Sequence, residues 1–186
     1  MILVFITSFC ALIALGFGAA AAWSDVSRLI IPNMYILYIL TAFFPAFLLS
    51  YFIAPEASLF YSLKGHIWAG LLVFVISYAL FHFKLIGGGD SKLLSVYALW
   101  VGLGGLLPLL FFMALTGGVL GLTTLYLKKY KPVANAKAGG WVATAQSGAE
   151  EVPYGVAILV GAIISFWQNG YIRPQSLLEV AQMSGG

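Results

Sequence analysis

The chain has 186 residues, of which 62% are hydrophobic and only 8% are charged, and its mean hydropathy is +1.00. Soluble globular proteins are about 45–50% apolar and about 25% charged, so this sequence lacks the charge that a water-exposed surface requires. The composition excludes an ordinary soluble domain and predicts an all-α protein that crosses a lipid bilayer several times. The one cysteine, Cys10, excludes an internal disulfide and a zinc ribbon or iron–sulfur cluster built from this chain alone.

The first three spans are regular. Residues 2–22 carry no charge and predict the first membrane-spanning helix. The rival interpretation is a cleaved signal peptide, but no Lys or Arg precedes the apolar stretch. Residues 34–53 and 66–83 predict the second and third spans. Pro32 stands just before the second span, where a helix tolerates proline best.

The region that follows is less regular. Residues 91–101 are apolar but cover less than about 20 Å as a helix, whereas the hydrocarbon core is about 30 Å thick. Three glycines, at 102, 104 and 105, separate this segment from the full-length apolar segment at residues 106–127. Two interpretations stay open: a short helix sunk into the protein, or a continuous helix with a glycine-softened bend. Residues 153–167 predict a last, short span.

We therefore expect about six spans in a single membrane domain, residues 1–170, with a cytoplasmic loop at residues 128–152 and a polar tail at residues 171–186. The basic residues predict that the N-terminus lies outside, because the inner connections then hold seven of nine, leaving Lys64 and Arg173 outside. A basic inner rim facing anionic lipid accounts for the pI of about 9.0, so we expect no nucleic-acid partner. The seven inner residues are Arg28, Lys84, Lys92, Lys128, Lys129, Lys131 and Lys137.

Two of the six acidic residues stand apart from the others. Asp25 follows the first predicted span and Asp90 precedes the fourth segment, so the topology brings both to the cytoplasmic face. An acid near hydrocarbon is costly and is a functional hypothesis by default. Two adjacent carboxylates resist ionising together, so one can hold a proton while the other takes one from water, as in aspartic proteases. The alternative is that each caps a helix, with Asp90 at the N-cap of residues 91–101. The other acids are in predicted loops or the tail: Glu56, Glu150, Glu151 and Glu179.

Three glycines precede Asp90 directly: Gly87, Gly88 and Gly89. They remove the side chains next to its carboxylate, permit backbone conformations barred to other residues, and allow an extended peptide to approach closely. A plain glycine turn would look the same in a chain with 21 glycines. The position of the three next to Asp90 favours the protease interpretation.

Two segments together carry a family pattern: Asp-Val-Ser-Arg-Leu-Ile-Ile-Pro-Asn at residues 25–33 and Gly-Gly-Gly-Asp-Ser-Lys-Leu-Leu at residues 87–94. The pair resembles the signature of the type IV prepilin peptidases, membrane aspartic proteases of the Gly-x-Gly-Asp class. Residues 152–157, before the last span, also look like a family element. The resemblance extends from about residue 5 to about residue 168.

The resemblance implies that Asp25 and Asp90 are the catalytic pair, acting without a metal or other cofactor. It implies that pilin precursors are the substrates and that their basic leader is cut off at the cytoplasmic face of a prokaryotic inner membrane. Longer members carry paired cysteines that bind zinc and also methylate the product. This chain lacks them, so it resembles the short, peptidase-only branch of Flp-type pili, with no methyltransferase activity expected. Structural or supporting roles are expected for the other motif residues: Arg28, Pro32, Asn33, Gly87, Gly88, Gly89 and Lys92.

Two other functions remain open. An intramembrane protease of the presenilin or signal-peptide-peptidase type shares Gly-x-Gly-Asp, but its first Asp follows a Tyr within a span, whereas Ser24 precedes Asp25 here. A small transporter or assembly subunit could use both acids to move protons or bind a cation, but gives no reason for the glycines. Lys92 itself is open to three interpretations: attraction to the aspartates, contact with lipid phosphate, or snorkelling.

Overall fold

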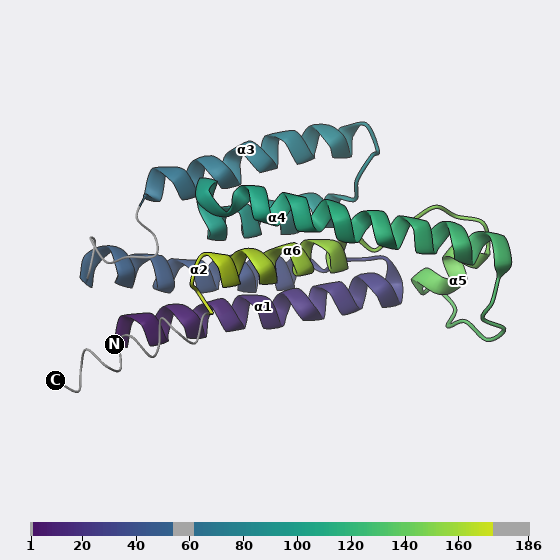
Figure 1. Cartoon of the computed structure of the whole chain (residues 1–186), viewed down its shortest axis with the longest axis horizontal. Helices are drawn as coiled ribbons and strands as arrows, with labels where there is room; N and C mark the ends of the chain where they lie inside the picture. The colour runs from purple at the N-terminus through teal and green to yellow at the C-terminus, as the bar shows by residue number, and fades with distance from the viewer. Residues whose placement is uncertain (1, 54–61, 173–186) are drawn as a thin grey trace.

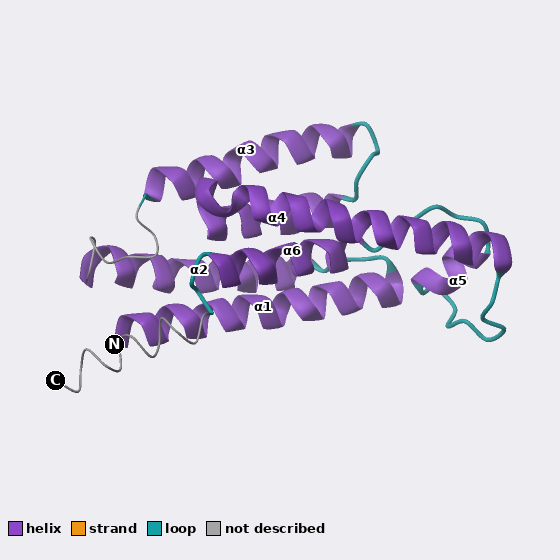
Figure 2. Cartoon of the chain, viewed as in Figure 1, coloured by secondary structure: helices purple, strands orange, loops and turns teal. Residues whose placement is uncertain are grey.

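A computed structural model describes residues 2–53 and 62–172, and within these ranges the regular secondary structure is helical throughout (Figures 1 and 2). The prediction of an all-α protein is confirmed. Glu56, Arg173, Glu179 and the rest of the predicted tail from residue 173 lie outside the described residues. The helices are α1 (Ile2–Arg28), α2 (Asn33–Ile53), α3 (Leu63–His82), α4 (Gly88–Tyr130), α5 (Trp141–Gln146) and α6 (Tyr154–Gln168).

The lengths and composition of the helices are those of a membrane protein. Three are long and apolar enough to cross a bilayer, Phe5–Arg28, Leu63–His82 and Gly88–Tyr130, and the described part of the chain adds shorter apolar helices at Asn33–Leu49 and Tyr154–Gln168. Large apolar side chains such as Phe9, Leu71 and Leu107 point outward. Such surfaces are stable against lipid tails and would be costly in water.

The first helix is longer than the predicted span. It continues beyond residue 22 because the run Trp-Ser-Asp-Val-Ser-Arg contains neither Gly nor Pro to stop it. It ends where Leu29 adopts a left-handed conformation, with φ of 53°. Asp25 therefore lies in the last turns of α1 and not beyond the end of the helix.

The helix α4 consists of two limbs, residues 88–101 and 103–130. Gly102, with φ of 64° and ψ of −174°, interrupts it, and the chain reverses there (Figure 1). Because of the reversal, Gly117 in the second limb lies against Tyr154, which lines the same pocket as Asp90 at the start of the first limb. The interpretation of a short helix sunk into the protein is confirmed, and that of a continuous bent helix is wrong.

Side chains satisfy the backbone around the break. A buried carbonyl left without a hydrogen bond would be costly. Each of these carbonyls instead accepts a hydrogen bond from a different element. The pairs are His66 Nδ1 with Leu99 O at 2.8 Å, Tyr171 Oη with Trp100 O at 3.0 Å, and Ser165 Oγ with Gly105 O at 2.8 Å.

The first limb of α4 runs through the core. Its Tyr97 and Trp100 are fully buried and bond to other helices, Tyr97 Oη to Ala14 O at 2.9 Å and Trp100 Nε1 to Ile39 O at 3.0 Å. These bonds tie the limb to α1 and α2. The start of the limb, which carries Asp90, is thereby fixed relative to the end of α1, which carries Asp25.

The predicted loop at residues 128–152 is partly helical. Its first three residues belong to α4, and α5 lies within it. Trp141 Nε1 donates to Thr124 Oγ1 at 2.9 Å, which holds α5 against the end of α4. The Lys128 ammonium and the Glu150 carboxylate form an ion pair at 2.7 Å. These contacts bring the segment before α6 back to the bundle.

Candidate active site

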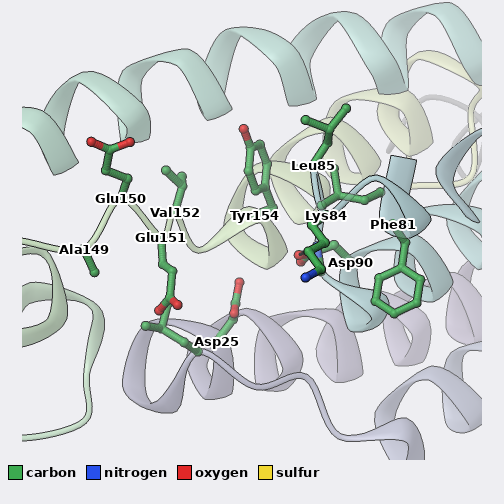
Figure 3. A pocket seen from close by; sticks show the side chains of 13 residues that line it. Asp25, Phe81, Lys84, Leu85, Asp90, Ala149, Glu150, Glu151, Val152 and Tyr154 are labelled. Carbon is green, nitrogen blue, oxygen red and sulfur yellow. Dashed lines mark hydrogen bonds between the residues drawn. The ribbon is translucent and has the colours of Figure 1, made fainter. Parts of the chain in front are cut away.

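Asp25 and Asp90 line the same pocket, at the end of the bundle where α1 finishes and α4 begins (Figure 3). The pocket has a volume of about 560 Å³. The predicted topology places the two acids at the same end of the molecule. The fold brings both to one cavity. The lining residues are Asp25, Leu29, Phe81, Lys84, Leu85, Ile86, Gly87, Asp90, Ala149, Glu150, Glu151, Val152 and Tyr154.

The Asp25 side chain is only 6% exposed and is held by the start of α6. Its Oδ2 accepts a hydrogen bond from the backbone N–H of Gly155 at 2.8 Å. The first N–H groups of a helix have no partner within the helix and lie at its positive end. The N-terminus of α6 therefore satisfies one oxygen of a carboxylate that α1 presents.

Asp90 is the third residue of α4 and does not occupy the expected N-cap position, which Gly87 holds. Its Oδ2 accepts from the Gly87 N–H at 3.2 Å, the reach-back bond of a capping box. Its Oδ1 is buried and has no hydrogen-bond partner among the residues that the structure describes. One oxygen of Asp90 is thus fixed by its own helix, and the other is left without a hydrogen bond from the described residues, which is unusual for a buried carboxylate oxygen.

The two carboxylates also act on each other electrostatically. Since a negative charge on one disfavours a negative charge on the other, their protonation belongs to the pair and not to either residue alone. Such a pair can hold one proton between two acids, as general acid–base chemistry requires.

The three glycines before Asp90 allow neighbouring side chains of the protein to pack closely against the backbone. None of them has a positive φ, so the expectation of a conformation barred to other residues is wrong. Their neighbours instead crowd the space that a side chain would need. A Cβ would lie 2.5 Å from Asp90 Oδ2 if added to Gly87, 3.2 Å from Phe81 Cε2 if added to Gly88, and 2.9 Å from Ile31 Cβ if added to Gly89.

Comparison with known proteins identifies the family. The type IV leader peptidase family matches residues 12–122, a range that contains both aspartates and both motifs. The chain belongs to the type IV leader peptidase family. The predicted resemblance is confirmed at this level.

A curated relative agrees with the assignment. The prepilin leader peptidase/N-methyltransferase of Xanthomonas campestris pv. campestris is 31% identical over 93 residues, which cover 47% of this chain and 27% of that protein. The matched region is thus a little over a quarter of the relative's length. No solved structure matches the chain.

Four of the expected supporting residues do not line the pocket: Arg28, Pro32, Asn33 and Lys92. Lys92 Nζ donates to Asn33 Oδ1 at 3.0 Å, a bond that joins the second motif to the first. Pro32 directly precedes α2, and Arg28 is the exposed last residue of α1. The observed partner of Lys92 is an amide of the other motif, which none of the three interpretations names.

The sequence interpretation missed one wall of the pocket. Ala149, Glu150, Glu151 and Val152 stand on one side of the aspartates, opposite Phe81, Lys84 and Leu85, with Tyr154 between (Figure 3). The two glutamates were expected to be ordinary loop acids. The Lys128 ammonium holds the pKa of the Glu150 carboxyl below its usual value. The available signal was that residues 152–157 look like a family element.

Four carboxylates line the pocket, those of Asp25, Asp90, Glu150 and Glu151, but they do not gather into a metal site. Among the residues that the structure describes, no group of three or more His, Cys, Asp or Glu side chains is placed to hold a metal ion. His66, the buried histidine, lies at the Gly102 break, where it bonds to Leu99.

Proposed function

We propose that this chain is a prepilin leader peptidase, an aspartic endopeptidase of the membrane. It hydrolyses the peptide bond between the basic leader and the mature N-terminus of a type IV pilin precursor. The observation that carries the proposal is the single pocket shared by Asp25 and Asp90, one from each family motif.

The two aspartates supply the chemistry as a pair. The ionised carboxylate takes a proton from a water molecule whose oxygen attacks the scissile carbonyl carbon, and the protonated carboxyl donates a hydrogen bond to the carbonyl oxygen. When the tetrahedral intermediate collapses, the C–N bond breaks and the departing amine receives a proton from the pair. The pair begins and ends the cycle with one proton, so no cofactor is needed.

The walls of the pocket suit this substrate. Glu150 and Glu151 make one wall negative, which complements a basic leader. Phe81 and Leu85 give the opposite wall, which also holds Lys84, an apolar surface that complements the apolar segment expected to follow the cleavage site in the bilayer. The aspartates lie between the two walls.

We further propose that the pocket faces the cytoplasm at a prokaryotic inner membrane, with the N-terminus outside. The support is that basic residues gather near the pocket end of the bundle, as the positive-inside rule requires of a cytoplasmic face. The substrates that we assign are Flp-type precursors, and their products leave this enzyme unmethylated. The single Cys10 cannot form the paired-cysteine site that the resemblance associates with methylation. The basic residues are Arg28, Lys84, Lys92 and Lys128.

Co-expression with candidate pilin precursors tests the proposal. The wild-type chain is expected to release the leader, and mass spectrometry of the product to show an unmethylated new N-terminus at the leader junction. Asp25→Asn and Asp90→Asn, verified as membrane-inserted and folded, are expected to leave the precursor intact, and EDTA to change nothing. Cleavage by either variant at the wild-type rate would contradict the proposal, and cleavage within a transmembrane helix would indicate an intramembrane protease.

A further inference from the structure

One buried side chain, Ile31, lies between the segments that carry the two aspartates. A Cβ added to Gly89, the neighbour of Asp90, would lie 2.9 Å from Ile31 Cβ and 3.5 Å from its Cγ1. A Cβ added to Gly155, which holds Asp25, would lie 3.3 Å from Ile31 Cδ1 and 3.0 Å from Asp25 Oδ2. The Cβ of Ile31 therefore packs against Gly89, next to Asp90, and its Cδ1 packs against Gly155, which binds Asp25.

A fixed turn delivers this side chain. Leu29 N–H donates to Asp25 O at 2.7 Å, and the left-handed conformation of Leu29 then turns the chain away from α1. Ser24 Oγ donates to Ile30 O at 2.8 Å and closes the turn. Ile31, which follows directly, is only 8% exposed. Its place is thus determined by hydrogen bonds to the same helical turn that carries Asp25.

The contacts leave little room for adjustment. Real Cβ atoms essentially never approach to under 3.0 Å, so the backbone of Gly89 packs directly on the branched carbon of Ile31. Closely packed interiors transmit displacements instead of absorbing them. A change in the length of this side chain is therefore expected to move the Gly89 segment relative to the Gly155 segment.

We propose that Ile31 is a positioning residue, the spacer that sets the separation of Asp25 and Asp90. The proposal rests on the proposed function, in which both carboxylates must reach one water molecule and one scissile bond. A misplacement of about 1 Å can cost about 10²-fold in rate. Ile31 touches no substrate in this account and acts through the two glycine segments.

Ile31→Val tests the proposal against a matched control. The substitution removes the Cδ1 methyl that faces Gly155 and keeps the Cβ that faces Gly89. Ile36→Val makes the same change at an equally buried position on α2, 7% exposed, whose side chain is not among the nearest neighbours of a Cβ at Gly89 or Gly155. We expect Ile31→Val to lower kcat about tenfold with KM nearly unchanged, because positioning affects the chemical step. Ile36→Val is expected to keep the wild-type kcat, and equal kcat values in the two variants would overturn the proposal.

A second measurement does not depend on activity. In a Cys10→Ala background, Asp25→Cys and Asp90→Cys form a pair that bismaleimide reagents of graded length can cross-link. We expect Ile31→Ala to shift the preferred reagent to a shorter length, and Ile36→Ala to leave it unchanged. An unchanged preference in Ile31→Ala would overturn the spacer role even if no precursor is cleaved. If wild-type cleavage depends on both aspartates but Ile31→Val behaves as Ile36→Val, the spacer role fails and the proposed function stands.

Discussion

Gly155 is far along the chain from Asp25, yet it fixes the position of the Asp25 carboxylate. Its N–H reaches Asp25 Oδ2 at 2.8 Å, and a Cβ at this position would lie 3.0 Å from the same oxygen. Contacts of 3.0–3.4 Å are tighter than nine in ten real Cβ contacts, so the neighbour would have to give way. Here the neighbour is one of the two proposed catalytic groups.

Gly155→Ala is expected to lower kcat about tenfold or more, because the added methyl displaces the Asp25 carboxylate or weakens its hydrogen bond. Gly118→Ala is the control, since a Cβ there meets nothing within 4 Å. In that helical setting alanine is expected to leave activity unchanged and to stabilise by up to about 1 kcal/mol. Steady-state kinetics on the purified variants check this, and wild-type kcat in Gly155→Ala would contradict it.

For individual residues, the sequence predicts the two aspartates but not the groups that hydrogen-bond to them. Charge is so scarce in this chain that acids next to apolar segments are conspicuous, which is why Asp25 and Asp90 could be selected. The hydrogen bond from Gly155 joins positions 130 apart, and no local pattern predicts it. The three glycines were selected for conformational freedom and for close approach by an extended peptide, whereas in the structure a Cβ at each would crowd a neighbouring side chain of the protein itself.

Among the elements, α4 departs most from a simple span. The first limb is short and reverses at Gly102, where φ is 64° and a Cβ would lie 3.0 Å from His66 Cε1. The reversal lets the first limb end inside the protein and the second return beside α6. The start of α6 and the start of α4 therefore meet at the same pocket.

Gly102→Ala is expected to destabilise the protein by about 1–3 kcal/mol, because alanine is strained at this φ and its methyl crowds the His66 ring. Gly104→Ala, two positions on with nothing within 4 Å of its Cβ, is the matched control. Reversible unfolding in detergent micelles measures both free energies of unfolding. Equal stabilities would show that the reversal does not require glycine.

The segment of residues 149–152 gives the pocket its negative wall. Lys128 fixes Glu150 at 2.7 Å, while Glu151 forms no ion pair with the residues that the structure describes. Of the two glutamates, Glu151 is therefore the one whose charge is open to a basic substrate.

Glu151→Lys is expected to lower kcat/KM for a precursor with a basic leader about three- to tenfold, mainly through KM, because exposed charges contribute modestly. A precursor whose leader lysines are changed to glutamate is expected to recover part of that loss. Asn135→Lys adds a lysine at an exposed position outside the pocket and serves as the control. Identical kcat/KM values for Glu151→Lys and Asn135→Lys would contradict a leader contact at this wall.

The predicted elements agree with the structure where composition alone decides them. The apolar runs predict α2, α3 and α6 closely, because burial in lipid requires an uninterrupted apolar helix. The end of α1 and the reversal in α4 could not be predicted, because each depends on distant contacts or a backbone conformation. Leu29 adopts a left-handed conformation in a turn closed by the hydrogen bond from Ser24 to Ile30, and Gly102 packs on His66 from another helix.

For the whole molecule, the two ends of the helix bundle differ in their number of basic residues. The end with the pocket holds Lys84, Lys92 and Lys128. Lys64 lies in the first turn of α3 at the other end, where the neighbouring Gly65 and His66 line a pocket with Gly102. In the proposed orientation the more basic end faces the cytoplasm, as the positive-inside rule requires.

Cysteine labelling is expected to confirm this orientation. In a Cys10→Ala background, a membrane-impermeant maleimide should label Lys64→Cys in intact spheroplasts and Asn135→Cys only after permeabilisation. Both positions are exposed, so accessibility within the protein does not limit either reaction. Labelling of Asn135→Cys in intact spheroplasts would reverse the orientation.

The central claim is that Asp25 and Asp90 act as one catalytic unit, and the kinetics of their combined substitution test it most directly. Purified Asp25→Asn and Asp90→Asn are each expected to lower kcat/KM for a pilin precursor by at least about 10²-fold. The double variant is expected to lose no more kcat/KM than the more impaired of the two single variants, because removing either member of a unit disables it. Either single variant retaining wild-type kcat/KM, or losses that multiply in the double variant, would contradict the claim.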